Sequence, residues 1–213
     1  MKSPARLIVM LGTLALTACS MLVGKHEDLT VYAPILAQPA ESSAQVARAW
    51  ELGIAEPRAI SPLDGAHIAV MPAAGELQTY KGARWRDASP VLIQQLLLQA
   101  FRDSVRLSGV GVPTSVPRAD FALLSDLQDF QAEYRGAKFP TIVIRLNAQL
   151  VDNSTGRVVA SRTFAVEETS AGAGVPEVFA AFQTALNKLL PQVVAWSAEA
   201  GDANWRVRPK AGR

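Results

Sequence analysis

The chain has 213 residues, of which 49% are hydrophobic, a length that suits one ordinary domain with its own core. Its net charge is +2, and Lys2 and Arg6 account for both units, so the rest of the chain is neutral and does not indicate a nucleic-acid-binding protein. The single cysteine, Cys19, excludes an internal disulfide framework and a thiolate metal site.

Residues 1–18 have the features of an export signal. Two basic residues precede a run of ten mostly apolar residues, 7–16, which is too short to span a bilayer as a helix. The run ends in Leu16-Thr17-Ala18-Cys19, which resembles the lipobox of bacterial lipoprotein precursors. We therefore predict a signal peptide over residues 1–18, and diacylglyceryl and acyl groups on Cys19 as the only non-protein groups. The alternative is a plain secretory signal that happens to end at a cysteine.

The segment after Cys19 bears on location. Residues 19–28 are polar and lack periodicity, which predicts a lipidated tether. Ser20 stands where some lipoproteins carry the aspartate that keeps them at the inner membrane. By that sorting rule we expect an outer-membrane lipoprotein that faces the periplasm, with one domain over residues 29–200. Residues 201–213 are predicted to be a basic disordered tail that contains Arg206, Arg208, Lys210 and Arg213.

In the first half of that domain the pattern predicts two strands and a helix. Loose alternation over residues 29–36 indicates a strand, and residues 43–52 are compatible with a short helix. Residues 67–71 form a compact apolar strand that a proline follows. Ser89-Pro90 has the chemistry of a helix start, which predicts a helix over residues 91–107.

The helix predicted at 91–107 carries more apolar surface than one contact needs. Its polar side chains occupy one narrow arc, whereas a helix that covers a sheet requires an apolar stripe of roughly 100°. We therefore expect Leu98 or Phe101, whichever faces outward, to take part in self-association or partner binding.

The second half of the domain predicts three strands and a closing helix. Period-two patterns cover residues 120–135, 141–151 and 157–168, with a hairpin turn at 152–156, and an amphipathic helix covers 176–198. The order predicts an α+β two-layer sandwich, in which a mixed, mostly antiparallel sheet carries two helices on one face. A right-handed crossover would place the first of these three strands parallel to the strand at 67–71.

Catalytic and metal-binding patterns are missing from the sequence. Its two histidines, His26 and His67, are far apart, and no nucleophile elbow, phosphate-binding loop or paired metal-ligand motif is present. We therefore predict a protein that is not an enzyme, with no catalytic residue and no metal site. Loss of activity in a folded His67→Ala variant would reverse that prediction.

Residues 75–86 combine aromatic and basic side chains ahead of the predicted helix. Side chains of this kind have an apolar body and a polar end, which suits a boundary between an apolar surface and water. The candidate contacts for a partner protein or lipid headgroups are therefore Tyr80, Arg84, Trp85 and Phe101. The alternative is that Trp85 closes the end of the sheet and the arginines are merely solvated.

A set of short motifs, in order, gives the sequence a family resemblance. They are Tyr32 and Pro34, Ile68-Ala69-Val70-Met71-Pro72, Tyr80, Arg84-Trp85, a leucine-rich helix through Leu96, Leu97 and Phe101, Leu127 with Phe130, Leu150 with Asp152 and Gly156, Ser161-Arg162 with Phe164, and a last helix with Trp196. Over residues 29–197 the chain resembles the auxiliary lipoprotein family of ABC-type transport systems, the PqiC-like group.

The resemblance implies a non-enzymatic part of a system that moves phospholipid or other apolar molecules between two membranes. Its implied partners are an MCE-domain protein and the inner-membrane ABC transporter subunits, and a homo-oligomer is compatible with it. The competing hypothesis is a structural or regulatory envelope lipoprotein, similar in fold to the N-terminal domain of TolB, that docks on a cell-wall or secretion machine.

Overall fold

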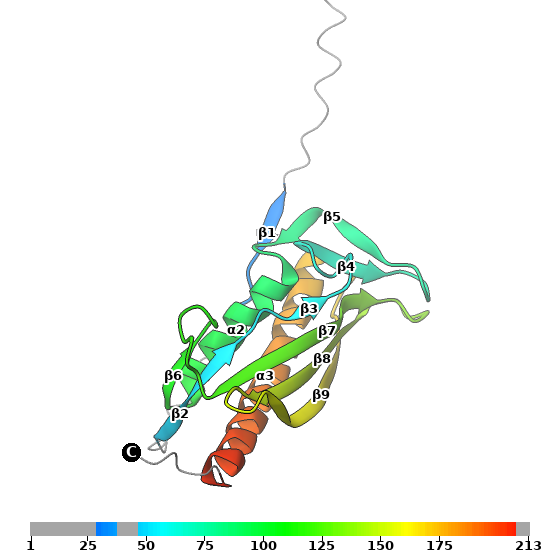
Figure 1. Ribbon diagram of the computed structural model, residues 1–213. Helices are drawn as coiled ribbons and strands as arrows, with labels where there is room; N and C mark the ends of the chain where they lie inside the picture. The colour runs from blue at the N-terminus through cyan, green and yellow to red at the C-terminus, as the bar shows by residue number, and fades with distance from the viewer. Residues whose placement is uncertain (1–28, 38–46, 208–213) are drawn as a thin grey trace, which may run out of the picture.

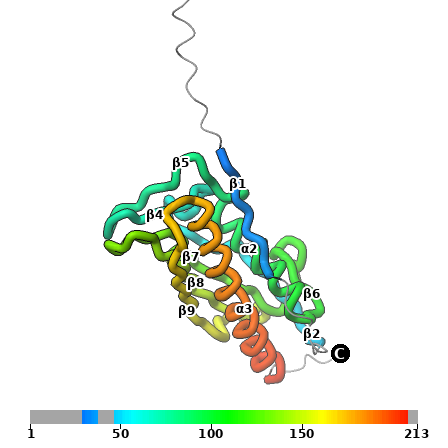
Figure 2. Tube along the Cα trace, turned by 180° about the vertical axis from the view of Figure 1, so that it is seen from behind, coloured from blue at the N-terminus to red at the C-terminus, as the bar shows by residue number. Residues whose placement is uncertain are grey.

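The computed structural model describes residues 29–37 and 47–207. In this part of the chain, nine strands form one mixed sheet, and two helices pack against one of its faces (Figures 1 and 2). The α+β architecture predicted from the sequence is therefore confirmed. The elements are β1 (Thr30–Tyr32), β2 (Arg48–Ile54), β3 (Arg58–Ala59), β4 (His67–Met71), β5 (Gln78–Trp85), α2 (Ser89–Ser104), β6 (Leu107–Gly111), β7 (Phe121–Glu133), β8 (Thr141–Asp152), β9 (Arg157–Thr169) and α3 (Val175–Val207).

The thirteen-residue strand β7 organises the sheet. Along one edge it pairs antiparallel with β8, which in turn pairs antiparallel with β9. Along its other edge β2, β3 and β4 follow one another, all parallel to β7. The predicted parallel pairing of the strand at 67–71 with the strand at 120–135 is therefore confirmed. Beyond β4 lie β5, antiparallel, and then β1, parallel to β5; beyond β2 lies β6.

Alternation along the strands decides which face the helices cover. On β8 the helix-facing side chains are all at most 1% exposed; they are Ile142, Ile144, Leu146, Ala148 and Leu150. The opposite face carries Arg145, Asn147 and Gln149 and remains open. Because successive strand residues point to opposite faces, this one pattern separates the core from the exposed sheet face. The hairpin predicted at 152–156 is also present, with Gly156 at a φ of +67°.

The short helix considered over residues 43–52 is wrong where the structure describes it. Residues 48–54 form β2, and residues 43–46 lie outside the described part. The inward residues Trp50, Leu52 and Ile54 are all 0% exposed. Their spacing of two fits a strand between parallel neighbours, whereas on a helix they would point in different directions.

Helix α2 corrects three predictions, on its cap, its last residue and its outward surface. It begins at Ser89, but the Ser89 hydroxyl donates a hydrogen bond to the Gly65 carbonyl at 3.1 Å instead of capping the helix. It ends at Ser104, and Leu107 opens β6. The expected outward apolar surface is also wrong: Leu98 is 8% exposed and Phe101 is 0% exposed. Helix α2 packs on α3 as well as on the sheet, so both apolar flanks are covered.

The closing helix is longer than predicted. Helix α3 continues to Val207, so residues 201–207 are helical, and residues 208–213 lie outside the described part. Its last turns approach β2 closely, because a Cβ at Gly201 would lie 2.5 Å from Cζ2 of Trp50. The indole Nε1 of Trp50 and Nε of Arg48 both donate to the Asp202 carboxylate, each at 2.9 Å. These contacts order turns that composition alone assigned to a tail.

The predicted N-terminal strand over residues 29–36 is shorter in the structure. Only its residues 30–32 form hydrogen bonds with the sheet, as β1. The chain after β1 instead runs along α3, where the Ile35 N–H donates to Oε1 of Gln183 at 3.0 Å and the Ala37 N–H donates to Oδ1 of Asn187 at 2.8 Å. The Gln183 amide also donates to the Ile35 carbonyl. Pro34 lacks an N–H for the sheet, which favours this transfer from strand to helix surface.

Candidate functional site

The basic and aromatic segment at 75–86 contains a strand that the sequence reading missed. β5 pairs with β4, but their register shifts between His67 and Ala69, so residues 80–83 form a bulge. Gly82 in that bulge has a φ of +66°, a conformation that glycine adopts without strain. The spacing of two between the buried residues Ala83 and Trp85 is typical of a strand. The bulge interrupts the alternation of inward and outward residues before them, so the sequence pattern did not indicate β5.

Two of the four candidate contact residues belong to the core. Trp85 is 0% exposed, and its ring lies 5.1 Å from Phe182 and 5.3 Å from Phe130 between centroids. Phe101 is likewise fully buried. The burial of Trp85 fits the alternative interpretation, in which it closes the end of the sheet, and neither side chain is accessible to a partner in this fold.

Tyr80 is half-buried, and its hydroxyl is withdrawn from the surface beside Tyr134. Burial, with a smaller contribution from Tyr134, raises the pKa of the Tyr80 phenol above its ordinary value. The phenol is therefore neutral at physiological pH, and its ring packs against the core.

Arg84 is the candidate residue that stays near the surface. Its Nη1 donates to the carbonyl oxygens of Trp85 and Arg86, at 3.3 and 3.4 Å. Both acceptors are neutral, so these two contacts do not compensate the positive charge of Arg84. Arg84 is in register with Val31 of the edge strand β1, and Val31 is 47% exposed. Leu29, next to β1, is 56% exposed. The structure thus joins basic and apolar surface at one sheet edge, and the apolar residues Leu29 and Val31 were not among the predicted contacts.

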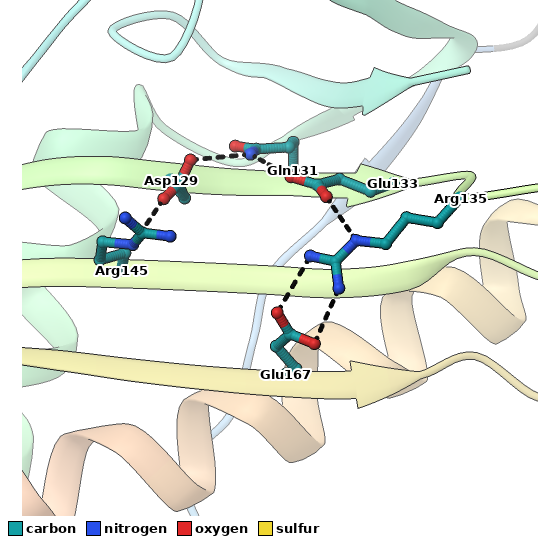
Figure 3. A network of polar contacts seen from close by, with 6 residues as sticks. All are labelled: Asp129, Gln131, Glu133, Arg135, Arg145 and Glu167. Carbon is teal, nitrogen blue, oxygen red and sulfur yellow. Dashed lines mark hydrogen bonds and ion pairs between the residues drawn. The ribbon is translucent and has the colours of Figure 1, made fainter. Parts of the chain in front are cut away.

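A second cluster of charged side chains lies on the sheet face that no helix covers (Figure 3). It consists of three carboxylates, two guanidinium groups and one amide: Asp129, Glu133, Glu167, Arg135, Arg145 and Gln131. The amide of Gln131, which is 3% exposed, donates to Asp129 at 3.0 Å and to Glu133 at 2.9 Å. It therefore holds two carboxylates of β7 at fixed positions.

The two guanidinium groups link this cluster across the strands. Arg145 of β8 contacts Asp129 at 2.9 Å. Arg135, just after β7, donates a hydrogen bond of 2.9 Å to Glu133. It also donates two hydrogen bonds, of 2.9 and 3.0 Å, to the carboxylate of Glu167 on β9. Every charged member has a partner within the cluster, so it ties three strands together and offers no unpaired acid or base for catalysis.

The Arg135–Glu167 contact gives a testable titration. Hydrogen bonds from Arg135 lower the pKa of the Glu167 carboxyl below its ordinary value of 4.5. Because the folded-state pKa is lowered, the contact adds stability above pH 4.5 and loses it as pH falls through the folded-state value. In Arg135→Gln we expect the Glu167 pKa to rise toward 4.5 in a carbon-13 NMR titration. Arg157→Gln, a matched change on β9, should leave it unchanged, and equal shifts in both variants would contradict the assignment.

Metal and membrane-spanning features are missing from the residues that the structure describes. Within residues 29–37 and 47–207, no group of three or more histidine, cysteine or acidic side chains is arranged to hold a metal ion. None of the helices in the same ranges combines the length and apolar character needed to cross a bilayer. His67 lies exposed at the start of β4.

A mostly apolar hollow lies between the two helices, beside the N-terminal segment. It has a volume of about 310 Å³, and its walls include Leu36, Ala100, Leu190 and Pro191, with Asp103 among the polar residues. This volume lies at the lower limit of pockets that hold small ligands. The hollow alone therefore does not identify a cargo site.

Comparison with known proteins relates this fold to one family. A family model described as the ABC-type transport auxiliary lipoprotein component matches residues 35–194. A crystal structure of a Xanthomonas campestris protein is 35% identical, covers 84% of this chain and 100% of its own, and superposes with a TM-score of 0.75. An uncharacterized protein of known crystal structure shares the fold at 14% identity and a TM-score of 0.52, covering 85% of this chain and 99% of its own.

A curated relative, an uncharacterized protein of Bradyrhizobium diazoefficiens, is 28% identical over 147 residues. The match covers 68% of this chain and 39% of that protein, so the chain corresponds to less than half of the length of this relative.

Proposed function

The chain belongs to the ABC-type transport auxiliary lipoprotein family, and from this membership we propose that it is a lipid-anchored, non-enzymatic docking subunit of an envelope system that transports phospholipid or other apolar molecules. The observation that carries the proposal is the family match over residues 35–194, which span every long element of the fold except the last turns of α3. The role as an auxiliary component of ABC-type transport follows from membership itself.

The proposed partners are an MCE-domain protein and the inner-membrane ABC transporter subunits. A docking role is supported by the mutually paired charges on the exposed sheet face, which make a fixed polar surface rather than a reactive one. Affinity capture from crosslinked envelopes, with a tag after Arg213, is expected to recover the MCE-domain protein. Recovery of a peptidoglycan synthase or secretion component without any MCE-domain protein would instead support the competing envelope-lipoprotein hypothesis.

We place the anchor at Cys19 and the protein in the outer membrane, facing the periplasm. The Leu16-Thr17-Ala18-Cys19 sequence supports lipid attachment, and Ser20 supports outer-membrane sorting. Cys19→Ala is expected to move the protein from the membrane fraction to the soluble fraction and to abolish incorporation of labelled palmitate.

Ser20→Asp is the matched control, because it should leave palmitate incorporation intact while moving the protein to the inner membrane in a density gradient. Persistence of Cys19→Ala in the membrane fraction would show that something other than this lipid holds the protein there.

A further inference from the structure

We infer that the sheet edge formed by β1 and β5 rests on the anionic headgroups of the membrane that holds the lipid anchor. This inference rests on the proposed lipid attachment at Cys19. It commits to a lipid surface as the occupant of that edge, and it orients the whole domain relative to the bilayer.

The apolar part of the edge faces outward along β1. Tyr32 points inward, with its ring centroid 4.8 Å from that of Phe179. Because strand residues alternate between faces, Val31 points away from the helices. Val31 is 47% exposed and Leu29 is 56% exposed. Large exposed aliphatic side chains on an edge strand are normally avoided unless another surface covers them.

The charged part of the edge is basic. Val31 and Arg84 are in register, so their side chains share one face of the sheet. Lys81 and Arg86 are exposed on the same strand and just beyond it. Asp87 compensates one of these charges through a 2.8 Å contact with Arg86. The edge therefore keeps excess positive charge beside aliphatic side chains, the combination that binds anionic headgroups.

The chain connection limits how far this edge can lie from the bilayer. Nine residues, 20–28, separate Cys19 from Leu29. A fully extended chain reaches at most about 3.6 Å per residue, so Leu29 lies within about 35 Å of the lipidated residue. Both views place β1 and β5 at one end of the domain and the C-terminal end of α3 at the other (Figures 1 and 2). With the β1–β5 edge on the membrane, the far end of α3 points into the periplasm.

The single natural cysteine allows a direct test in the full-length lipoprotein. Once Cys19 is acylated, Val31→Cys supplies one free thiol for an environment-sensitive fluorophore. The labelled protein is reconstituted in vesicles that contain lipid with a nitroxide on its headgroup. We expect strong quenching at position 31 and severalfold weaker quenching in Ser161→Cys, an exposed control on β9.

Charge dependence gives the second arm of the test. Quenching at position 31 should increase when phosphatidylglycerol replaces part of the phosphatidylcholine. Lys81→Glu with Arg86→Glu should lower the ratio of docked to undocked molecules by more than about tenfold, since each cation near an anionic surface contributes about a fivefold preference. Arg102→Glu with Arg106→Glu, two exposed residues at and just beyond the end of α2, is the charge-matched control and should have no effect.

Equal quenching at positions 31 and 161, or quenching at 31 that ignores both phosphatidylglycerol and the charge reversal, would overturn the inference while leaving the anchor intact. A protein that does not associate with vesicles and shows an unmodified Cys19 by mass spectrometry would contradict the proposed anchor, and the inference would be lost with it.

Discussion

Phe101→Asp is expected to abolish the folded domain rather than to disturb a binding surface. Phe101 is 0% exposed and lies in the core between α2, the sheet and α3. Removing a buried phenylalanine ring costs about 3–5 kcal/mol, and an uncompensated buried carboxylate adds several kcal/mol more. The sum approaches the total stability of a typical domain, about 5–15 kcal/mol.

Circular dichroism and urea unfolding of the purified variant measure this effect. Gln99→Asp introduces the same charge two residues earlier on the exposed side of α2, and it should unfold at nearly the same urea concentration as the unmodified protein. A cooperatively folded Phe101→Asp protein that has lost only self-association or partner binding would restore the outward-facing interpretation of this helix.

Asp202→Ala is expected to lower the free energy of unfolding by about 2–3 kcal/mol, although Asp202 lies near the end of a helix where substitutions are usually tolerated. Its carboxylate accepts from Trp50 and Arg48 of β2, each at 2.9 Å. Alanine would leave the indole N–H of a fully buried tryptophan without this acceptor and would remove a partly buried ion pair.

Two variants separate these contributions in urea unfolding. Asp202→Asn keeps an oxygen acceptor for Trp50 and loses the charge and the acceptor for Arg48, so its destabilisation should be clearly smaller. Glu199→Ala removes an exposed carboxylate from the same helix and should have little effect. If Asp202→Ala and Glu199→Ala proved equally mild, the last turns of α3 would not depend on the contact with β2.

The two proposed surfaces divide the molecule by chemistry. The β1–β5 edge combines aliphatic and basic side chains, whereas the exposed face of β7, β8 and β9 carries paired charges and an amide. An apolar and basic edge suits a lipid surface, and a fixed polar face suits a protein partner. In the proposed orientation, the β1–β5 edge contacts the membrane and the exposed face of β7, β8 and β9 stays available to a protein partner.

The amino-acid sequence alone was enough to predict those elements of the fold that depend on neighbouring residues. The alternation on β8 and the turn at Gly156 each follow from a few neighbouring residues, so these elements appeared where expected. The family was likewise recognisable from short motifs, because it depends on their order along the chain rather than on distances in space. The lipidation of Cys19 stays a prediction of the same local kind, since a lipobox is recognised as a linear segment.

The tertiary structure alone decided whether an apolar side chain is buried or available. Phe101 looked surplus on an isolated helix and is covered because α3 packs beside α2. Residues 48–54 became a strand because β6 and β7 flank them, and the last turns of α3 are ordered because Trp50 and Arg48 reach Asp202. Each outcome depends on residues tens to more than a hundred positions apart, which no local pattern can register. The same long-range pairing left Leu29 and Val31 exposed beside Arg84 at the sheet edge.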